Sequence, residues 1–401
     1  MDPIERARRT TGAVSRRRLL AGVGCGAVAL GGCLGGDGEA NTGRGKPSDP
    51  TIGGAPMFQY DRQNTGDGGD SGPSIGSGDG AERFRATLEE PVYSSPAIVD
   101  GVVYVGSGSR VVALDANDGV RLWSAETTGA VRSSPAVVAG TVLIGTRGNL
   151  VYALDADDGS ERWRTDVNGG VDSSPAVVDG TVYVGTRATA GRVYALDADD
   201  GSERWAFETD YRVISSPAVA DGTVYVGGWD TAVYAIAADE GTERWRVDTG
   251  QPVLSSPAVV DETVYVGGND ETLYALNAED GDERWRAETD GIVTTPAVAD
   301  GTVYTGTETA AGRVYAFDAA DGTERWWIDV GTAVTTPLSV AGETVQFGRR
   351  DGCLSVIGSD DGERRFRGET GGEIRSAPTV AGGTVYVGSN DGRLYAFGDD
   401  D

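Results

Sequence analysis

The sequence predicts an all-β fold, an eight-bladed β-propeller of four-stranded antiparallel blades, and three observations carry this prediction. A short proline-containing motif recurs eight times along the chain at a nearly constant spacing. Each repeat contains runs rich in Val, Tyr and Thr that are separated by glycine turns, with no helical periodicity. The last repeat lacks one strand, and a strand of the missing type precedes the first repeat.

The repeat is marked by the tetrapeptides SSPA, TTPA, TTPL and SAPT. Their prolines are Pro96, Pro135, Pro175, Pro217, Pro257, Pro296, Pro337 and Pro378, and subtracting successive positions gives spacings of 39, 40, 42, 40, 39, 41 and 41. A period near 40 residues without helical character excludes helical solenoids and is typical of propeller blades.

The third unit shows the four strands of one blade. Residues 171–178, 181–186, 192–198 and 202–209 each have the composition of a strand, and Asp179-Gly180 makes a tight hairpin turn between the first two. Four antiparallel strands per unit form one propeller blade.

The two ends of the repeat region predict how the ring closes. Residues 83–88 have the pattern of a fourth strand, whereas the last unit stops after its third strand, at residues 393–398. We therefore expect the N-terminal strand to pair with the C-terminal one in the last blade of a propeller that spans residues 83–401. Such pairing removes the exposed sheet edge that an open ring would leave.

The segment ALDADDGSERWR, residues 153–164, resembles a calcium loop at first sight. Its glycine is kept in all seven copies, but the aspartate four residues earlier is replaced by Ala237 in one copy and Gly358 in another. A repeated calcium site would keep its oxygen ligands, whereas a repeated turn keeps the glycine that tolerates a positive φ. The segment is therefore predicted to be a turn.

The N-terminus carries features of an export signal. SRRRLL, with Arg16 and Arg17, resembles the twin-arginine motif, and the apolar run 19–32 is shorter than the ~20 residues that span a bilayer. LGGC resembles a lipobox, which implies cleavage before Cys33 and a lipid on its sulfur. We expect a lipoprotein signal peptide at 1–32, export by the twin-arginine route, and anchoring to the outer face of the cytoplasmic membrane. A plain signal peptide with chance cysteines is the alternative.

Residues 33–82 are rich in Gly, Asp, Ser and Pro and predict a flexible acidic tether. One island, MFQYDRQNTG at residues 57–66, is too apolar for a free linker, and we expect it to pack against the body.

The composition restricts the function. Asp and Glu number 62 against 34 Lys and Arg, the formal net charge is −28, Lys46 is the single lysine, and histidine is absent. An acidic, lysine-poor surface resembles that of halophilic archaeal proteins, with an ordinary acidic protein as the alternative. The charge argues against nucleic-acid binding, and the lack of histidine excludes His-dependent catalysis and metal ligation. Of Cys25, Cys33 and Cys353, only the last lies in the body, so the body has no internal disulfide.

The pattern SSPA, DGTVYVG, YALDA-x-DG-x-x-x-W over residues 83–401 resembles the repeat of PQQ-type (quinoprotein) β-propellers. This group contains PQQ-dependent dehydrogenases and non-enzymatic propellers such as the bacterial outer-membrane assembly lipoprotein. The resemblance implies that a tryptophan four residues after each turn glycine docks on the neighbouring blade: Trp123, Trp163, Trp205, Trp245, Trp285 and Trp326. The dehydrogenases carry an adjacent cysteine pair and long insertions, but Cys353 stands alone and the blades are short, so the likeness to the enzymes stops at the scaffold.

The candidate binding face holds the loops that join fourth to first and second to third strands. Three residues before the prolines lie Tyr93, Arg132, Asp172, Ile214, Leu254, Val293, Val334 and Arg375, which predicts a channel mouth with one polar half and one apolar half. The second-to-third loops add Trp229 and the pair Arg349 and Arg350, which suits an anionic ligand or acidic peptide. Solvated loop tips are the alternative interpretation.

These features favour a monomeric, membrane-anchored extracytoplasmic scaffold that binds a protein partner or an extended peptide, with no catalytic residues, no metal and no cofactor. The alternative is a PQQ-dependent oxidoreductase, which would require PQQ with Ca²⁺.

Overall fold

The computed structural model describes residues 58–59, 61, 63–69, 72–73, 78–79 and 82–398. The expected signal peptide and lipid anchor, with Arg16, Arg17 and Cys33, lie outside the described residues. Within the described part of the chain, no helix is long and apolar enough to cross a membrane.

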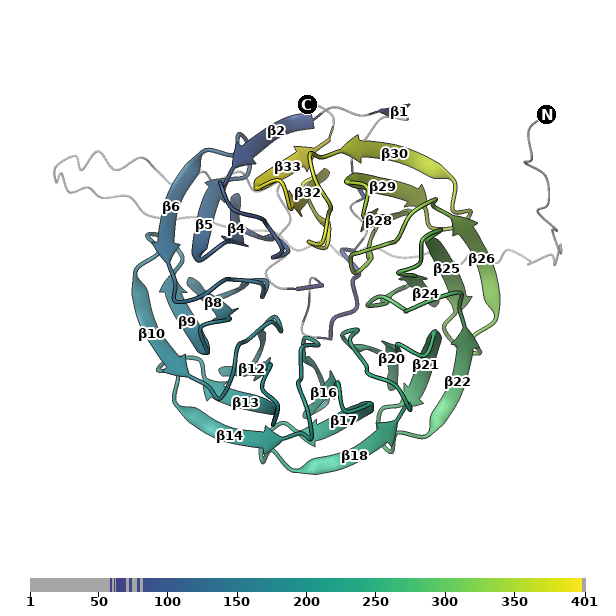
Figure 1. Ribbon diagram of the computed structural model, residues 1–401, viewed down its shortest axis with the longest axis horizontal. Helices are drawn as coiled ribbons and strands as arrows, with labels where there is room; N and C mark the ends of the chain where they lie inside the picture. Colours follow the sequence, from purple (N-terminus) through teal and green to yellow (C-terminus); the bar gives the residue numbers. More distant parts are fainter. Residues whose placement is uncertain are drawn as a thin grey trace, which may run out of the picture. The chain divides into compact units, whose positions relative to one another are not determined.

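Eight antiparallel sheets stand in a ring around a central channel, so the predicted eight-bladed propeller is confirmed (Figure 1). Each of the first four blades is continuous in sequence. Blade 1 contains β3 (Ala97–Val99), β4 (Val102–Ser107), β5 (Arg110–Asp115) and β6 (Arg121–Glu126); blade 2 contains β7 (Ala136–Val138), β8 (Thr141–Thr146), β9 (Leu150–Asp155) and β10 (Glu161–Asp166). Blade 3 contains β11 (Ala176–Val178), β12 (Thr181–Gly185), β13 (Arg192–Asp197) and β14 (Glu203–Glu208); blade 4 contains β15 (Ala218–Ala220), β16 (Thr223–Gly227), β17 (Ala232–Ala237) and β18 (Glu243–Asp248).

The remaining blades follow the same order until the chain closes. Blade 5 contains β19 (Ala258–Val260), β20 (Thr263–Gly267), β21 (Thr272–Asn277) and β22 (Glu283–Glu288); blade 6 contains β23 (Ala297–Ala299), β24 (Thr302–Gly306), β25 (Arg313–Asp318) and β26 (Glu324–Asp329). Blade 7 contains β27 (Ser339–Ala341), β28 (Thr344–Gly348), β29 (Cys353–Gly358) and β30 (Arg364–Glu369), to which β1 (Gly78–Asp79) adds in parallel.

Blade 8 is built from both ends of the propeller. Its strands β31 (Thr379–Ala381), β32 (Thr384–Ser389) and β33 (Arg393–Phe397) come from the C-terminal region, and β2 (Glu82–Thr87) completes it. The pairing of β2 with β33 is antiparallel, as the sequence predicts. Closure therefore leaves the ring without an unpaired outer strand at the seam.

The first strand of each blade is shorter than predicted. In blade 3 the expected strand 171–178 reduces to β11, which begins only after Pro175. The residues before the proline bond elsewhere: the N–H of Val171 donates to the carbonyl of Thr146 in blade 2, and the N–H of Ser174 donates to Oγ of Ser216 in blade 4. These residues link blades to one another and do not extend the strand.

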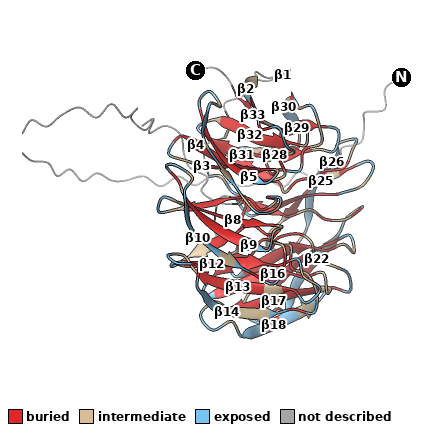
Figure 2. Cartoon of the chain, turned by 60° about the vertical axis from the view of Figure 1, so that its left-hand side comes forward, coloured by how far each residue is buried: buried red, intermediate tan, exposed pale blue. Residues whose placement is uncertain are grey.

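The core lies between the blades. The three inner strands are buried on both faces, and the outer strands alternate, as in β10, where Trp163 is buried between exposed neighbours (Figure 2). Each hydrophobic cluster draws side chains from neighbouring blades; one joins Val184 of blade 3 to Val151 and Trp163 of blade 2. The packing therefore joins every blade to the next.

The tryptophans of the outer strands dock on the following blade. Each indole N–H donates to a backbone carbonyl in the turn between third and fourth strands of the next blade, at 2.9 to 3.0 Å: Trp123 to Ala156, Trp163 to Ala198, Trp205 to Ala238, Trp245 to Ala278, Trp285 to Ala319 and Trp326 to Ser359. Blade 7 has Phe366 in place of the tryptophan, and its ring packs on Phe397 of blade 8 with centroids 5.8 Å apart and the ring planes tilted by 59°.

Hydrogen bonds between the proline motifs link most blades around the channel. The second residue of each motif donates its N–H to the side-chain oxygen of the second residue in the next blade: Ser95 to Ser134, Ser134 to Ser174, Ser174 to Ser216, Ser216 to Ser256, Ser256 to Thr295 and, across the seam, Ala377 to Ser95. Blade 7 differs because its motif is shifted by one residue relative to the strands. Thr336 accepts the N–H of Gly348 as the first motif residue Ser133 accepts that of Gly145, so Pro337 takes the place of the second residue and has no N–H. The residue that would accept from it is Ala377, which has no side-chain oxygen.

A segment from the N-terminal region lies inside the channel against blades 4 to 7 (Figure 1, purple). The carbonyls of Gln63, Thr65 and Gly66 accept the N–H groups of Val259 in β19, Val298 in β23 and Val340 in β27, respectively, at 2.6 to 2.9 Å. Asn64, only 2% exposed, donates its amide to the carbonyls of Ser216 and Pro217 at 3.1 Å. This segment, residues 63–69, is called the channel segment below.

Candidate functional site

The loops of the predicted binding face come together at one end of the channel. In blade 2, the N–H of Arg147 in the second-to-third loop donates to the carbonyl of Ala130, which precedes the first strand. On the opposite face, the hairpins between first and second strands meet the turns between third and fourth strands, as shown in blade 2 by the N–H of Ala156 donating to the carbonyl of Gly140. The mouth of the channel is therefore formed by the loops that vary most between repeats.

Arg132 lies over an aromatic ring at this mouth. Its guanidinium carbon is 4.2 Å from the centroid of the Tyr93 ring, a cation–π arrangement between blades 1 and 2. Partial burial, with repulsion from Arg147 adding to it, lowers the pKa of Arg132 from its usual value. Among the described residues, no carboxylate forms an ion pair with Arg132, although Asp172 lies near enough to attract its charge.

Asp172 is held by a neighbouring arginine. The Nε and Nη2 atoms of Arg147 donate to its two carboxylate oxygens, both at 2.8 Å, and this bond raises the pKa of Arg147. Arg187 approaches the same carboxylate at 3.6 Å. The sequence placed Asp172 at the mouth as a candidate ligand-binding residue, but the structure pairs it with Arg147 and leaves Arg187 as the more exposed cation.

A second arginine lies beside two neighbouring aromatic rings on the blade 4 side. Arg212 is 5.1 Å from the Tyr211 ring and 5.2 Å from the Trp229 ring, and the two rings are 6.4 Å apart. The indole N–H of Trp229 is buried without a hydrogen-bond acceptor in the described structure. The sequence analysis singled out Trp229 but missed Tyr211 and Arg212. The signal that could have revealed them is the occurrence of two large side chains just before Val213 and the proline motif of blade 4.

The Arg349-Arg350 pair does not act as one unit. Arg349 is 15% exposed and binds Asp351 in its own loop, whereas Arg350 is half exposed and lies 3.8 Å from Glu308 and 3.7 Å from Glu373. Arg375, which the sequence also placed at the mouth, lies 3.1 Å from the same Glu373. Arg350 and Arg375 thus face the two carboxylates Glu308 and Glu373, and the three arginines on the blade 7–8 side are balanced by three carboxylates.

The apolar half of the mouth differs from the prediction. Val293 and Val334 are 3% and 0% exposed and pack in the core instead of facing the channel. In blade 2, Arg132 stands between the buried Val131 and the first motif residue, but in blade 6 Val293 directly precedes that residue, so the intervening position is missing. In blade 7 the proline comes one residue earlier relative to the first strand than in the other blades. The half-buried apolar side chains are Ile214, Leu254 and Ile292, and the last two line a cavity of about 180 Å³ with Glu308.

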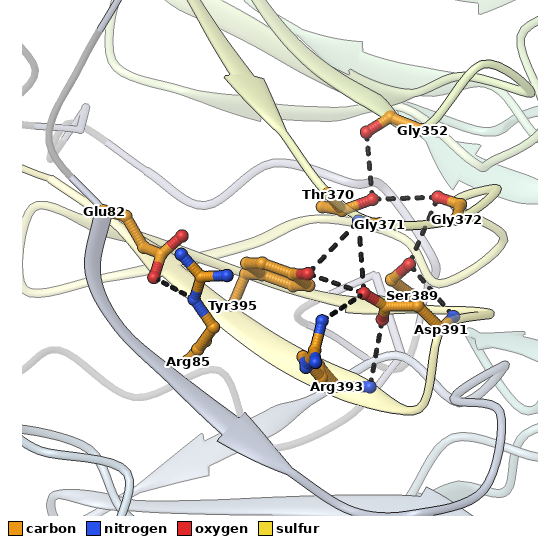
Figure 3. A network of polar contacts seen from close by, with 10 residues as sticks. All are labelled: Glu82, Arg85, Gly352, Thr370, Gly371, Gly372, Ser389, Asp391, Arg393 and Tyr395. Carbon is orange, nitrogen blue, oxygen red and sulfur yellow. Dashed lines mark hydrogen bonds and ion pairs between the residues drawn. The ribbon is translucent and has the colours of Figure 1, made fainter.

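Tyrosine–carboxylate pairs fix the second-to-third loops in three blades. In blade 8 the Tyr395 hydroxyl donates to Asp391 at 2.6 Å, and Asp391 and Tyr395 both accept from the N–H of Gly371 before that blade (Figure 3). Tyr274 donates to Asp270 in the same way, and burial together with this bond raises the pKa of Tyr274 to about 12. These bonds give the mouth rigid walls.

The sequence as a whole matches one family model. The family described as outer membrane protein assembly factor BamB matches residues 45–150, 108–228, 148–255, 189–309 and 310–401, which together span the propeller. The chain belongs to this family. A search of curated proteins found no match.

Solved structures show the same fold at low sequence identity. The BamB structure from Moraxella catarrhalis is 20% identical with a TM-score of 0.68 and covers 80% of this chain and 99% of its own. Quinohemoprotein alcohol dehydrogenase from Comamonas testosteroni is 16% identical with a TM-score of 0.73 and covers 87% of this chain and 81% of its own. The computationally designed protein Ika8 is 17% identical with a TM-score of 0.71 and covers 80% of this chain and all of its own. At these identities the structures share the fold alone with this BamB-family chain.

The sequence of this BamB-family chain lacks the adjacent cysteine pair that its resemblance to the quinoprotein dehydrogenases would imply. Cys353, the cysteine of the propeller, is buried against the guanidinium of Arg367. Over the described ranges, no group of three or more Cys, Asp or Glu side chains is arranged to hold a metal ion.

Proposed function

We propose that this protein is a non-catalytic interaction and assembly scaffold, which binds a protein partner at the channel mouth. The observation that carries the proposal is the pair of arginines that contact aromatic rings, Arg132 over Tyr93 and Arg212 beside Tyr211 and Trp229. Arginine, tyrosine and tryptophan are the residue types that dominate binding energy in protein interfaces. Since neither guanidinium has a carboxylate partner in the described structure, each can pair with an acidic group of the partner.

Charge distribution supports this choice of face. The chain has a formal net charge of −28, yet Arg132 and Arg212 lie at partly exposed positions of the mouth without an ion pair among the described residues, whereas Arg187 and Arg350 face carboxylates. A local positive surface on an acidic protein steers acidic partners to that surface. The name of the family, an assembly factor, agrees with a role in protein assembly.

The proposed location follows from the N-terminal sequence. Arg16 and Arg17 in the twin-arginine-like motif, with Cys33 in the lipobox-like motif, support export and a lipid anchor on the outer face of the cytoplasmic membrane. The acidic, lysine-poor composition supports work in concentrated salt. Replacing Arg16 and Arg17 with lysine should leave the precursor in the cytoplasm, and Cys33→Ala should abolish lipid labelling.

Affinity capture tests the scaffold proposal. The immobilised propeller should retain a partner from membrane extract, and the double variant Arg132→Ala/Arg212→Ala should lose it. A matched control is Arg164→Ala/Arg286→Ala, because these arginines lie on exposed outer strands, each with one glutamate partner. Equal capture by both double variants would contradict the proposal.

A PQQ-dependent oxidoreductase is the second candidate, supported by the fold likeness to quinohemoprotein alcohol dehydrogenase. The lack of an adjacent cysteine pair in the sequence weighs against it. Purified protein mixed with PQQ and Ca²⁺ should show neither a bound-quinone absorbance nor dye reduction with alcohols or sugars. A positive result in this assay would favour the dehydrogenase instead of the scaffold.

A further inference from the structure

Blade 6 is one residue shorter than blade 5 at the mouth of the channel. In blade 5, Leu254 stands between the buried Val253 and the first motif residue, Ser255. In blade 6, the buried Val293 directly precedes the first motif residue, Thr294. Ser255 and Thr294 are equivalent, because the side-chain oxygen of each accepts a backbone N–H from the second strand of its own blade, at 2.7 and 3.1 Å. The position of Leu254 therefore has no counterpart in blade 6.

A cavity of about 180 Å³ lies where this residue is missing. It is lined by Leu254 of blade 5, by Ile292 and Val293 of blade 6, and by Thr335 and Pro337 of blade 7. An apolar cavity of about 150 Å³ in a protein core is large enough to bind benzene. The cavity of blade 6 therefore has room for one large aliphatic or aromatic side chain.

The polar groups of the cavity wall are already engaged. Each hydroxyl of the wall makes a hydrogen bond with a backbone group of the protein: Ser255, Thr294, Thr295, Thr335 and Thr336. Among the described residues that line the cavity, Glu308 is the one with a charge, and it faces Arg350 at 3.8 Å. A polar ligand would find few free partners here, whereas an apolar group enters without leaving a hydrogen bond unmade.

The cavity lies two blades from the arginine of blade 4. Hydrogen bonds from the N–H of Ser216 to Ser256 and from the N–H of Ser256 to Thr295, at 2.8 and 2.9 Å, join blades 4, 5 and 6 beside the channel. Cα atoms of adjacent inner strands approach within 8 Å, so about five residues of an extended chain span the two steps. Arg212, which has no ion pair among the described residues, is therefore within reach of a peptide whose side chain enters the cavity.

We propose that this cavity receives one large apolar side chain of the partner protein, from a segment that also carries a carboxylate for Arg212 about five residues away. The apolar side chain takes the place of the residue that blade 6 lacks. An apolar anchor in a pocket supplies binding energy, and the charge pair fixes the direction in which the segment lies. This inference rests on the proposed function and specifies the chemistry of the partner at the mouth.

A displayed library of random peptides, each about twelve residues long to cover this spacing, is the probe and is panned against the full chain. The enriched peptides should share one Leu, Ile, Met or Phe, with an Asp or Glu within about five residues of it. In a labelled enriched peptide, replacing the shared apolar residue with alanine should weaken binding about tenfold or more in fluorescence anisotropy. No enrichment, or enriched peptides without a shared apolar residue, would overturn the proposal.

Filling the cavity from the protein side should block the same peptide. Ile292→Trp enlarges a half-buried residue of the wall, and a leucine inserted between Val293 and Thr294 restores the missing position. Both changes should weaken binding about tenfold or more. Leu122→Trp adds the same ring at a 48% exposed position of β6 and, as the matched control, should bind like the parent. Parent-like binding by a folded Ile292→Trp chain would overturn the proposal, and the alanine-substituted peptide tests it on the unaltered protein.

The arginines are tested separately from the cavity. Arg132→Ala/Arg212→Ala should weaken the parent peptide and its alanine version by the same factor, because the charge pair and the apolar anchor act at different places. Unchanged binding by this double variant, with binding still lost in Ile292→Trp, would contradict the role of the arginines and support the cavity; the reverse would overturn the cavity alone.

Other occupants of the cavity give different results. Enrichment only against a chain that lacks residues 34–57 would make the chain's own tether the occupant. Self-association of the full chain that Ile292→Trp abolishes would make the occupant a second copy. Either result would overturn the proposal.

Discussion

Gly241 in blade 4 lies directly against the indole ring of Trp205 in blade 3. A Cβ at Gly241 would be 2.6 Å from Cδ2 of that ring, and φ at Gly241 is +68°. The glycine is therefore required twice, once by its backbone conformation and once by the side chain of the preceding blade. This contact explains why the turn glycine is kept while the nearby aspartate is not.

The contact predicts that Gly241→Ala destabilises more than a positive φ alone would. Gly250 has φ +76° with open space around its Cβ position, so Gly250→Ala should cost only ~1 kcal/mol of backbone strain. Gly241→Ala should cost about 1–3 kcal/mol more, because the added methyl overpacks against Trp205. Chemical denaturation of both variants measures the difference, and equal losses would show that the ring does not matter.

Removing the ring itself should be more costly. Trp205→Ala removes an indole that donates to the Ala238 carbonyl and packs on Tyr183, with ring centroids 5.8 Å apart. We expect a loss of ~3–5 kcal/mol in the free energy of unfolding. Trp327 is 42% exposed on β26, and Trp327→Ala is the control that should cost far less. An unchanged melting temperature in Trp205→Ala would contradict the docking role.

The hydrogen bonds between proline motifs predict an asymmetric response to serine substitutions. Ser174→Ala leaves the buried N–H of Ser134 without an acceptor and should cost about 1–3 kcal/mol. Ala377→Ser adds a hydroxyl where Pro337 has no N–H to donate, so it should give no stabilisation. Thermal unfolding of the two variants tests this, and a stabilised Ala377→Ser protein would be inconsistent with the arrangement.

Asn64 anchors the channel segment. Asn64→Ala removes two buried hydrogen bonds to the carbonyls of Ser216 and Pro217, and we expect a loss of about 1–3 kcal/mol. Gln63→Ala is the matched control, because the neighbouring residue contributes its backbone carbonyl to Val259. If both variants unfold at the same temperature as the parent, the segment does not stabilise the propeller.

Acid should destabilise the propeller through its turns. Arg162, Arg204 and Arg325 hold the pKa values of Asp155, Asp197 and Asp318, respectively, below the usual 3.8. A folded-state pKa below the unfolded value adds stability above about pH 4 that is lost as pH falls through the folded pKa. The melting temperature should therefore be flat near neutral pH and fall below about pH 4. The triple Asp→Asn variant should show a shallower fall, and an identical pH profile would contradict this origin.

Much of the fold could be predicted because every repeat shows the same motif, turns and strand-like segments in its sequence. The proline spacing gave the number of blades, and the strand-like residues 83–88 predicted the closure that β2 and β33 make. The prediction from position in the repeat was wrong where the register between proline motif and strand changes. Counting back from Pro296 and Pro337 placed Val293 and Val334 at the mouth, but a missing residue in blade 6 and a shifted proline in blade 7 put both in the core.

The candidate site could be predicted only in part. Tyr93 and Arg132 follow from position in the repeat, but their stacking depends on the distance between two blades. The apolar residues of 57–66 predicted that this part of the chain packs against the body, but they could not place it in the channel, because its contacts with Val259, Val298 and Val340 are made by backbone carbonyls. A glycine-rich sequence that binds through its backbone resembles a linker when only side chains are read.

Site-specific photocrosslinking in the source cells tests the scaffold proposal most directly. A photo-reactive amino acid at Tyr211, between blades 3 and 4 at the mouth, should give a discrete crosslinked protein, whereas the same residue at Leu122, 48% exposed on β6, should not. The crosslinked species should disappear when Arg132 is also replaced with alanine. No crosslinked species at Tyr211, or the same species at Leu122, would contradict the account.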